Sequence, residues 1–264
     1  MQSARFNMQC PICENEAGFW QYFKTVPILQ CTAGDCGFCF FYLPDWKSPY
    51  SKVDYYESWR PGPLAYATPW NRARVDIVKK FKQTGAVAEL GCGIGETALA
   101  LSKAGYQVVG VEESPKAIDF LKKEYPGTEW VNENILQYLN NNPRRFDVIT
   151  MFHVLEHIPE PKNVIRLVDA ALRPGGVIVI EVPDVGGGFA RLKGLNWDYF
   201  IDHHVNYFDA KSLTKLLGLV GYRLKLLERT YHFSFPQGNM IKDFIKGSLA
   251  RLGMNSIIRT VWAK

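Results

Sequence analysis

The chain has 264 residues, of which 47% are hydrophobic, and a formal net charge of +5. This length suits one sizeable α/β domain with a small appendage, and the charge is too small and too scattered to indicate a nucleic-acid groove. Because we find neither an apolar stretch of about eighteen residues nor an N-terminal signal sequence, we expect a cytoplasmic protein that does not enter a membrane.

Five of the six cysteines lie within the first forty residues. Cys10 and Cys13 form one pair, and an aromatic, strand-like stretch separates them from Cys31, Cys36 and Cys39. This spacing predicts a zinc ribbon over residues 1–43, in which four thiolates hold one structural zinc ion. So short a segment cannot bury enough apolar surface to fold without such help.

The expected zinc ligands are Cys10, Cys13, Cys31 and Cys36, because a glycine follows Cys36 and can free backbone amides to point at sulfur. Cys36 with Cys39 is the alternative second pair, since it has the more usual gap of two residues.

Residues 44–69 are rich in proline and aromatic residues and are interpreted as a linker that lies across the larger domain. A helix is expected from Trp70 to about Phe81, at the start of a domain that extends over residues 70–264. Its basic residues are interpreted as a solvated helix face; they are Arg72, Arg74, Lys79, Lys80 and Lys82.

A buried strand, Ala86–Leu90, leads into a glycine-rich turn and then into a helix. Glycines at alternate positions let the backbone take positive φ and approach a ligand, which the N–H groups of the next helix face. Glu89, just before the turn, can reach a cation or a hydroxyl of that ligand. A nicotinamide-dependent dehydrogenase is disfavoured, because Glu96 stands where the dinucleotide fingerprint needs its third glycine.

Further strands are expected at residues 107–112, 129–135, 177–183, 223–229 and 257–263. Glu112 ends the second strand, where a carboxylate can accept hydrogen bonds from two ribose hydroxyls. Residues 146–158 are expected to form another strand that runs into a helix carrying His157. Helices at 163–172 and 210–221 then complete an alternating α/β pattern.

Four features resemble motifs of class I S-adenosylmethionine-dependent methyltransferases: the glycine turn, the strand ending in Glu112, the Leu-Glu-His-Ile segment at 155–158, and the Leu-x-Pro-Gly-Gly turn at 172–176. This resemblance implies a doubly wound, seven-stranded Rossmann-like α/β sheet. It also implies that S-adenosylmethionine contacts Glu89, Gly91, Cys92, Gly93, Gly95, Glu112, Glu113, Asn134, Ile135 and Phe152. Asn134 replaces the family's Asp, and its amide oxygen can accept the same hydrogen bond from adenine.

The segment that ends in His204-x-x-Tyr207-Phe208 resembles one in family members that act on sugars and other small hydroxylated molecules. We therefore expect methyl transfer to a sugar, a nucleotide sugar or a polysaccharide-related metabolite. His204, with His203 as second choice, is expected to remove the acceptor's proton or to orient the acceptor. A histidine held by a backbone hydrogen bond is the alternative for His204.

Two other functions fit the sequence. Some ribosomal RNA methyltransferases also carry an N-terminal zinc ribbon, and such an enzyme would bind RNA with an affinity that falls steeply as salt rises. A zinc-dependent interaction module without catalysis would bind no S-adenosylmethionine. The sequence indicates neither the oligomeric state nor which atom of the acceptor is methylated.

Overall fold

A computed structural model describes residues 8–42, 68–230, 248–249 and 252–264, so the predicted linker at 44–69 falls almost entirely outside the described residues. Contacts divide the chain into two units, and each is described here by itself. The glycine-turn unit contains Lys47–Phe152, Arg166–Ile180 and Ala263–Lys264. The ribbon–histidine unit contains Met1–Trp46, His153–Ile165 and Glu181–Trp262.

The glycine-turn unit alternates helices and strands, as the sequence pattern predicts. Its helices are α2 (Pro69–Phe81), α3 (Glu96–Lys103), α4 (Pro115–Glu124) and α5 (Ile135–Asn141), and its strands are β5 (Ala86–Leu90), β6 (Gln107–Glu112), β7 (Glu129–Asn132) and β8 (Phe146–Phe152). Two helices begin in the same way, because the side chains of Thr68 and Ser114 accept hydrogen bonds from Asn71 N and Ala117 N and a proline follows each cap.

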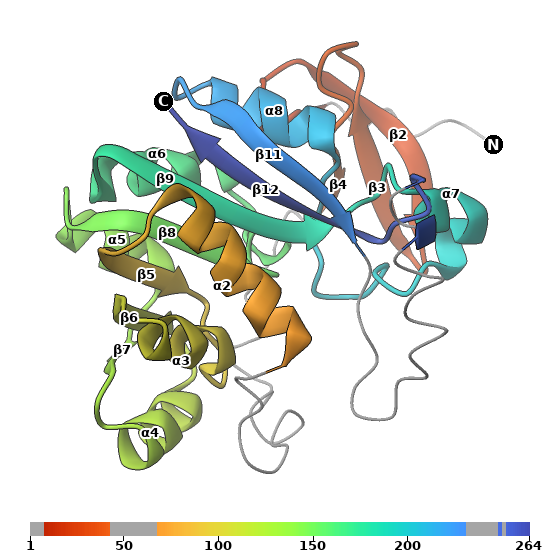
Figure 1. The fold of residues 1–264 in the computed structure, drawn as a ribbon. Helices are drawn as coiled ribbons and strands as arrows, with labels where there is room; N and C mark the ends of the chain where they lie inside the picture. The colour runs from red at the N-terminus through yellow and green to blue at the C-terminus, as the bar shows by residue number, and fades with distance from the viewer. Residues whose placement is uncertain (1–7, 43–67, 231–247, 250–251) are drawn as a thin grey trace. The chain divides into compact units, whose positions relative to one another are not determined.

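The expected seven-stranded sheet is confirmed, with the order β11-β12-β9-β8-β5-β6-β7 (Figure 1). Its remaining strands are β9 (Leu172–Pro183), β11 (Arg223–Thr230) and β12 (Ile257–Ala263), and α6 (Pro161–Ala171) precedes β9. Strand β5 pairs in parallel with both β6 and β8. The chain therefore winds outward from β5 through β6 to β7 and then returns to the other side of β5, which makes the β5–β8 junction the switch point where open α/β sheets bind ligands.

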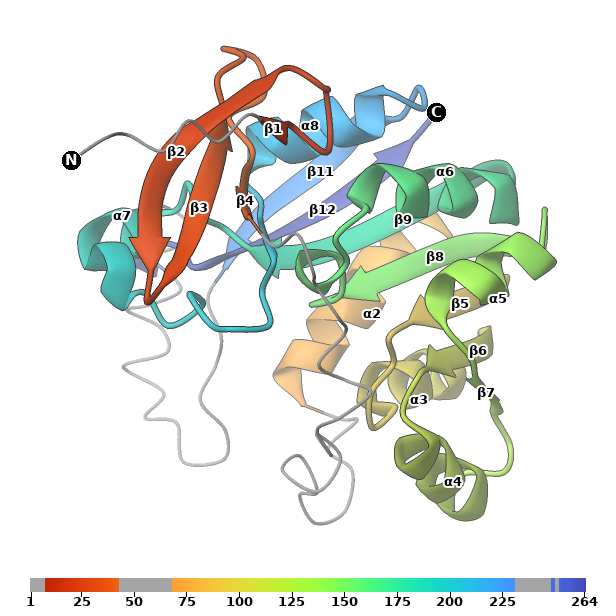
Figure 2. The same ribbon diagram turned by 180° about the vertical axis from the view of Figure 1, so that it is seen from behind.

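The ribbon–histidine unit contains a second, five-stranded sheet of order β1-β2-β3-β4-β10, of which Figure 2 labels β1 to β4. Four strands come from the N-terminal segment: β1 (Met8–Gln9), β2 (Glu16–Phe23), β3 (Val26–Cys31) and β4 (Cys39–Phe41). The fifth, β10 (Asn206–Tyr207), begins two residues after His204, the second of the two predicted site histidines. Asn206 pairs with Phe40 and Tyr207 with Cys39, so the predicted ribbon and the histidine segment share one antiparallel sheet.

A hydrophobic core joins the same two parts of this unit. It is formed by Ile28, Cys39, Phe41, Ala190, Trp197, Phe200 and Tyr207. Ala190 belongs to α7 (Gly188–Lys193), which is followed by the short 3-10 helix η3 (Gly194–Asn196). Because both sides contribute buried aromatic rings, packing as well as strand pairing fixes the histidine segment against the ribbon strands.

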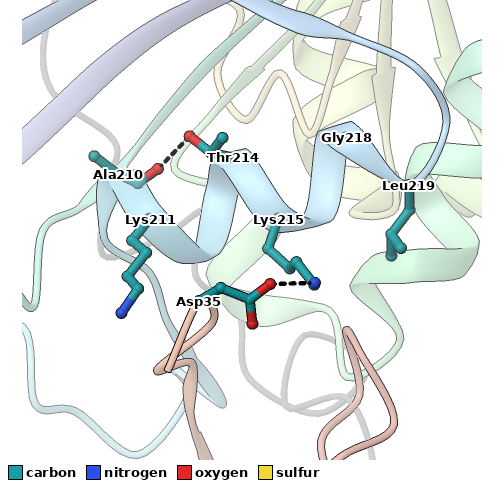
Figure 3. A pocket seen from close by; sticks show the side chains of 7 residues that line it. All are labelled: Asp35, Ala210, Lys211, Thr214, Lys215, Gly218 and Leu219. Atoms are coloured by element: carbon teal, nitrogen blue, oxygen red, sulfur yellow. Dashed lines mark hydrogen bonds and ion pairs between the residues drawn. The ribbon is translucent and has the colours of Figure 1, made fainter. Parts of the chain in front are cut away.

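An ion pair adds a polar contact between helix α8 (Ala210–Gly218) and the loop that carries Cys36 (Figure 3). The Lys215 ammonium lies 2.5 Å from the Asp35 carboxylate, at the edge of a surface depression lined also by Ala210, Lys211, Thr214, Gly218 and Leu219. Both partners are solvent-exposed enough that the pair contributes little free energy.

The helix that the sequence predicts after β8 is not present as an α-helix in the structure. The predicted helix after β8 is only a three-residue 3-10 helix, η2 (Leu155–His157), because His153 takes a left-handed φ of 58° directly after the strand and Pro159 and Pro161 follow. Among the helices in the described ranges, none combines the length and the apolar character that crossing a membrane requires.

Candidate functional site

The carboxyl ends of three strands meet at one edge of the glycine-turn unit. Leu90 of β5 is in register with Val111 of β6 and with Met151 of β8. The residue that follows each of them therefore stands in one row along the sheet edge. These residues are Gly91, Glu112 and Phe152, all three predicted from the sequence as cofactor contacts.

The glycine turn after β5 uses positive φ at each alternate glycine: 64° at Gly91, 53° at Gly93 and 80° at Gly95. A Cβ added to Gly95 would lie 2.7 Å from Leu121 and 2.8 Å from Trp130, so packing excludes a side chain there. A Cβ added to Gly93 would meet no described atom within 4 Å. Gly95 thus permits close packing, while Gly93 leaves an open cradle beside the backbone.

Glu112 is held in a fixed orientation by backbone donors. Its Oε2 accepts a hydrogen bond from Gly93 N, and its Oε1 accepts one from Ser114 N, both at 3.0 Å. The Asn132 amide donates to the backbone oxygens of Glu112 and Glu113, also at 3.0 Å, and so fixes the end of β6. Each carboxylate oxygen keeps a further lone pair that can accept a ligand hydroxyl.

Glu89 is a buried carboxyl group in β5, with 4% of its surface exposed. Burial raises the pKa of Glu89 to about 8, although the positive charge of Arg74 acts in the opposite direction. Its Oε2 has no hydrogen-bond partner among the described residues. A buried carboxyl group with an unsatisfied oxygen is suited to a cationic or hydroxyl-bearing ligand, which would favour its charged form.

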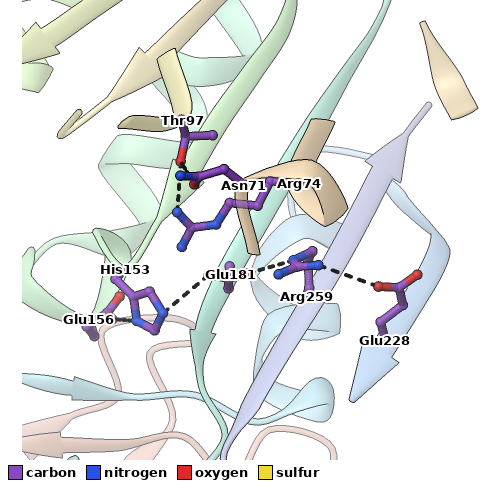
Figure 4. A network of polar contacts seen from close by, with 8 residues as sticks. All are labelled: Asn71, Arg74, Thr97, His153, Glu156, Glu181, Glu228 and Arg259. Carbon is purple, nitrogen blue, oxygen red and sulfur yellow. Dashed lines mark hydrogen bonds and ion pairs between the residues drawn. The ribbon is translucent and has the colours of Figure 1, made fainter. Parts of the chain in front are cut away.

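Helices α2 and α3 contribute polar groups that the sequence analysis missed (Figure 4). The Arg74 guanidinium donates to Thr97 Oγ1 at 2.9 Å, and Thr97 Oγ1 donates to Asn71 Oδ1 at 3.0 Å. Arg74 also lies over the ring of Phe152, with its Cζ 4.4 Å from the ring centroid. The interpretation of Arg74 as part of a solvated helix face is therefore wrong, and periodicity gives no signal for it because a basic residue near a helix start is usually exposed.

Four further predicted cofactor residues occupy varied positions. Cys92 is buried, which raises the pKa of its thiol, and its N–H donates to Val111 O at 3.0 Å. Asn134 is the N-cap of α5, where its Oδ1 accepts from Leu136 N at 2.9 Å and keeps one lone pair. Glu113 is exposed and Ile135 is half-buried. Their contact with a cofactor stays a prediction.

In the ribbon–histidine unit, the sulfur atoms of Cys10, Cys13, Cys31 and Cys36 lie within 4.8 Å of one another. The Sγ atoms of Cys10 and Cys36 are 3.9 Å apart, and those of Cys13 and Cys31 are 3.4 Å apart. A zinc–sulfur distance of about 2.3 Å places the thiolates of a tetrahedral site about 3.8 Å apart. The backbone N–H of Ile12 also points at Cys10 Sγ, at 3.4 Å. These residues therefore fit a four-thiolate metal site.

Cys39 is not part of this sulfur cluster. It lies in β4, where it pairs with Tyr207, and its thiol donates to Gly37 O at 3.6 Å. Burial raises the pKa of Cys39 to about 12, as expected for a thiol in an apolar core.

A charged network lies at the start of the histidine-bearing part of this unit (Figure 4). His153 Nδ1 is 3.2 Å from Glu156 Oε1, and His153 Nε2 is 3.3 Å from Glu181 Oε1. Arg259 Nε donates to Glu181 Oε2 at 2.5 Å. Burial lowers the pKa of His153, but its hydrogen bonds with Glu156 and Glu181 outweigh burial and raise the pKa to about 9.

The predicted site histidines, His203 and His204, lie beside His157. His204 Nδ1 is 2.9 Å from Tyr199 O, and burial lowers the pKa of His204 to about 3. The Tyr199 ring is nearly parallel to the rings of both His153 and His204, at centroid distances of 6.3 and 6.2 Å. The structure thus places His204 in a buried aromatic and imidazole cluster, with the backbone hydrogen bond that the alternative interpretation anticipated.

Comparison with known proteins decides the family. A family model described as "Methyltransferase domain" matches residues 56–227. The chain belongs to this methyltransferase family. Its sequence is similar to ubiquinone biosynthesis O-methyltransferases: it is 32% identical to one from Coxiella burnetii over 136 residues, which cover 50% of this chain and 54% of that protein. It is 30% identical to one from Yersinia pestis over 167 residues, which cover 61% of this chain and 68% of that protein. The chain thus spans about half the length of the first of these curated relatives.

Solved structures show the same methyltransferase fold. A SAM-dependent methyltransferase from Archaeoglobus fulgidus matches with a TM-score of 0.56 and 18% identity, over 74% of this chain and 94% of that chain. The 1,6-didemethyltoxoflavin-N1-methyltransferase from Burkholderia thailandensis, solved with S-adenosylhomocysteine, matches with a TM-score of 0.58 and 15% identity, over 94% and 99%. The fold expected from the glycine turn and the acidic strand ends is therefore confirmed.

Proposed function

We propose that this member of the methyltransferase family transfers a methyl group from S-adenosylmethionine to a hydroxyl of a small molecule. The observation that carries the proposal is the row formed by Gly91, Glu112 and Phe152 at the switch point of the sheet, with the Glu112 carboxylate held by Gly93 N. The bound cofactor would supply a methyl group that is already activated by its sulfonium charge. The task of the chain is to bind the cofactor and to orient the acceptor.

Different residues at this edge of the sheet are proposed to bind different parts of the cofactor. Glu112 is proposed to bind the ribose hydroxyls through the lone pairs that its backbone donors leave available. The open side of Gly93 lets the methionine part lie against the backbone. Glu89 and Arg74 offer opposite charges to the ammonium and carboxylate groups of that part. The other expected contacts are Cys92, Gly95, Glu113, Asn134 and Ile135.

The acceptor class is proposed from the named relatives, which are O-methyltransferases, and from the histidine segment. Both indicate a hydroxylated acceptor. Within that class we propose a sugar, a nucleotide sugar or a related metabolite, because the His204-x-x-Tyr207-Phe208 segment is similar to that of sugar-modifying family members. His204 and His203 are proposed to act on the acceptor hydroxyl.

The four-cysteine cluster is proposed to hold one structural zinc ion. Its spacing supports this, since the measured sulfur separations of 3.9 and 3.4 Å lie on either side of the tetrahedral value of about 3.8 Å. Cys10 and Cys13 lie in the turn between β1 and β2, while Cys31 ends β3 and Cys36 lies in the loop before β4, so zinc would tie these two turns together at one end of the ribbon sheet.

The decisive experiment measures methyl transfer from labelled S-adenosylmethionine to three acceptor panels: nucleotide sugars, phenolic compounds and ribosomal RNA. Transfer to a small hydroxylated compound, without salt-sensitive RNA binding, is the expected result. Methylation of RNA alone would replace the proposed acceptor and would favour the zinc-ribbon RNA enzyme. If the chain bound no S-adenosylmethionine, the catalytic proposal itself would fail.

A further inference from the structure

Three of the chain's histidines converge within the ribbon–histidine unit. His157 belongs to η2, while His203 and His204 stand just before β10. One ring nitrogen from each of the three lies within 4.8 Å of those of the other two. The ring centroids of His157 and His204 are 4.7 Å apart, and His203 is 5.4 Å from each. Side chains from two separate segments are thus brought to one point.

Backbone carbonyls fix which nitrogen of two rings carries the proton. His157 Nδ1 lies 2.9 Å from His203 O, and His204 Nδ1 lies 2.9 Å from Tyr199 O. A carbonyl oxygen can only accept, so both Nδ1 atoms must donate and both Nε2 atoms must carry the lone pair. Metal-binding histidines are oriented in this way, with the second ring nitrogen donating to a carbonyl or carboxylate.

The two segments are also tied to each other around the cluster. Val205 N donates to Glu156 O at 2.9 Å, and the Asn206 side chain donates to Ile158 O at 2.6 Å. Asn206 and the residue after it pair with β4. These bonds hold the backbone on both sides of the three rings, so the rings are positioned in advance.

A buried negative charge lies next to the cluster. Glu156, adjacent to His157 in η2, is 1% exposed, and its carboxylate interacts electrostatically with both His157 and His204. One of its oxygens pairs with His153, while Oε2 has no hydrogen-bond partner among the described residues. Three neutral imidazoles beside a carboxylate attract a divalent cation more strongly than an anion or a neutral ligand.

We propose that His157, His203 and His204 bind one divalent transition-metal ion of the Zn²⁺ class, separate from the ion of the cysteine cluster. Zinc–nitrogen distances of about 2.0–2.1 Å place the ligands of a tetrahedral site about 3.3 Å apart. The ring nitrogens lie within 4.8 Å of one another, a separation that side-chain rotations can adjust to this value. His157 and His203 are half-buried, and His204 is buried. Three protein ligands leave a fourth position open to water, as in catalytic rather than structural zinc sites.

The role of this fourth position rests on the proposed function. If the acceptor is hydroxylated, its oxygen would replace the water, and the metal would lower the pKa of that hydroxyl so that its proton passes to solvent. The oxygen would then bond to the methyl group as the bond from methyl to the sulfonium sulfur breaks, and the demethylated cofactor would be the leaving group. His203 and His204 then act on the acceptor through the metal. Binding of the metal itself does not depend on any cofactor or acceptor.

The test is a calorimetric titration of the full chain, isolated with its cysteine site loaded with zinc, by further Zn²⁺. We expect one additional site in the wild type, weakened by about 100-fold or more in His203→Ala and in His157→Ala, since even the loss of a group that orients a ligand costs about 10–100-fold. Glu124→Ala, at an exposed position at the end of α4 and outside the cluster, is the control and keeps the site. Far-ultraviolet circular dichroism checks that each variant is folded.

Two results would overturn the inference: no additional site in the wild type, or an additional site that His203→Ala and His157→Ala leave unchanged. S-adenosylmethionine affinity is measured on the same samples. A chain that binds the cofactor but no additional zinc refutes only the histidine site, and a chain that binds additional zinc but no cofactor refutes only the proposed function.

Discussion

The carboxylate of Glu112 accepts a hydrogen bond from the backbone N–H of Gly93 at 3.0 Å. This bond joins the end of β6 to the turn that follows β5, so the acidic strand end and the glycine turn form one preorganised surface. Binding of a ligand to both therefore costs little entropy for ordering them, because the protein holds them in place before binding.

Replacing Glu112 by Ala is expected to weaken S-adenosylmethionine binding by about 2 kcal/mol or more, since paired hydrogen bonds to a charged group are lost. Isothermal titration calorimetry measures this change. Glu124→Ala, at an exposed position at the end of α4, is the matched control and should leave the affinity unchanged. Equal affinities of the Glu112 variant and the wild type for S-adenosylmethionine would show that Glu112 does not bind the cofactor.

The two neighbouring glycines should respond differently to alanine. Gly95→Ala forces a Cβ to within 2.8 Å of both Leu121 and Trp130 at a φ of 80°, so we expect a loss of at least about 2 kcal/mol of unfolding free energy. The Cβ of Gly93→Ala would meet no described atom, so this variant should lose only about 1 kcal/mol of unfolding free energy, the cost of positive φ. The same Cβ should fill the open side of the turn and weaken cofactor binding.

Urea denaturation and calorimetry on the two glycine variants separate these effects. A Gly93 variant that bound the cofactor as tightly as the wild type would show that the open side of the turn is not used by the ligand.

Zinc content should distinguish the cysteines. Cys36→Ser is expected to lose the bound zinc and to lower the melting temperature, because its sulfur lies 3.9 Å from Cys10 Sγ within the cluster. Cys39→Ser should keep its zinc, since Cys39 lies in β4 outside the cluster. Atomic absorption measures both. If Cys39→Ser lost its zinc and Cys31→Ser kept it, the second ligand pair would be Cys36 and Cys39 instead of Cys31 and Cys36.

The stability of the chain should depend on pH through His153. The pKa of His153 is raised to about 9 in the folded chain, against about 6.5 when unfolded, so the stabilisation is complete below about pH 6.5 and is lost as the pH rises through 9. Its full size is up to about 3 kcal/mol. His153→Gln should therefore be less stable than the wild type at pH 7, with the difference shrinking toward pH 9.5.

Urea titrations of the two proteins across pH 6–10 test this expectation. A stability difference that did not change with pH would mean that folding does not shift the pKa of His153.

The central sheet could be predicted because its strands are continuous apolar runs ended by glycine or an acidic residue. Ala86–Leu90 and Gln107–Glu112 have the expected bounds, and the parallel register then places Gly91, Glu112 and Phe152 together without further information. The cysteine cluster could also be predicted, because the members of each pair, Cys10 with Cys13 and Cys31 with Cys36, are close in the sequence.

The features that could not be predicted from the sequence depend on tertiary contacts. Strand β10 is only two residues long and forms because β4 supplies a partner, so no periodicity indicates it. Arg74 takes its role from Thr97 and Phe152, which lie far from it in the sequence. The helix predicted after β8 failed because the left-handed φ of His153, fixed by the buried carboxylates on both sides of its ring, ends the strand in a different direction.

The pairing of β4 with β10 limits how this chain can be shortened. A fragment that begins at residue 68 would retain the glycine turn and Glu112, but it would leave Asn206 and Tyr207 as an unpaired strand edge beside uncovered Phe200 and Trp197. Exposed edges with aromatic surface favour self-association. Expression of residues 68–264 alone is therefore an aggregation hazard, and the glycine turn is better expressed together with the ribbon strands.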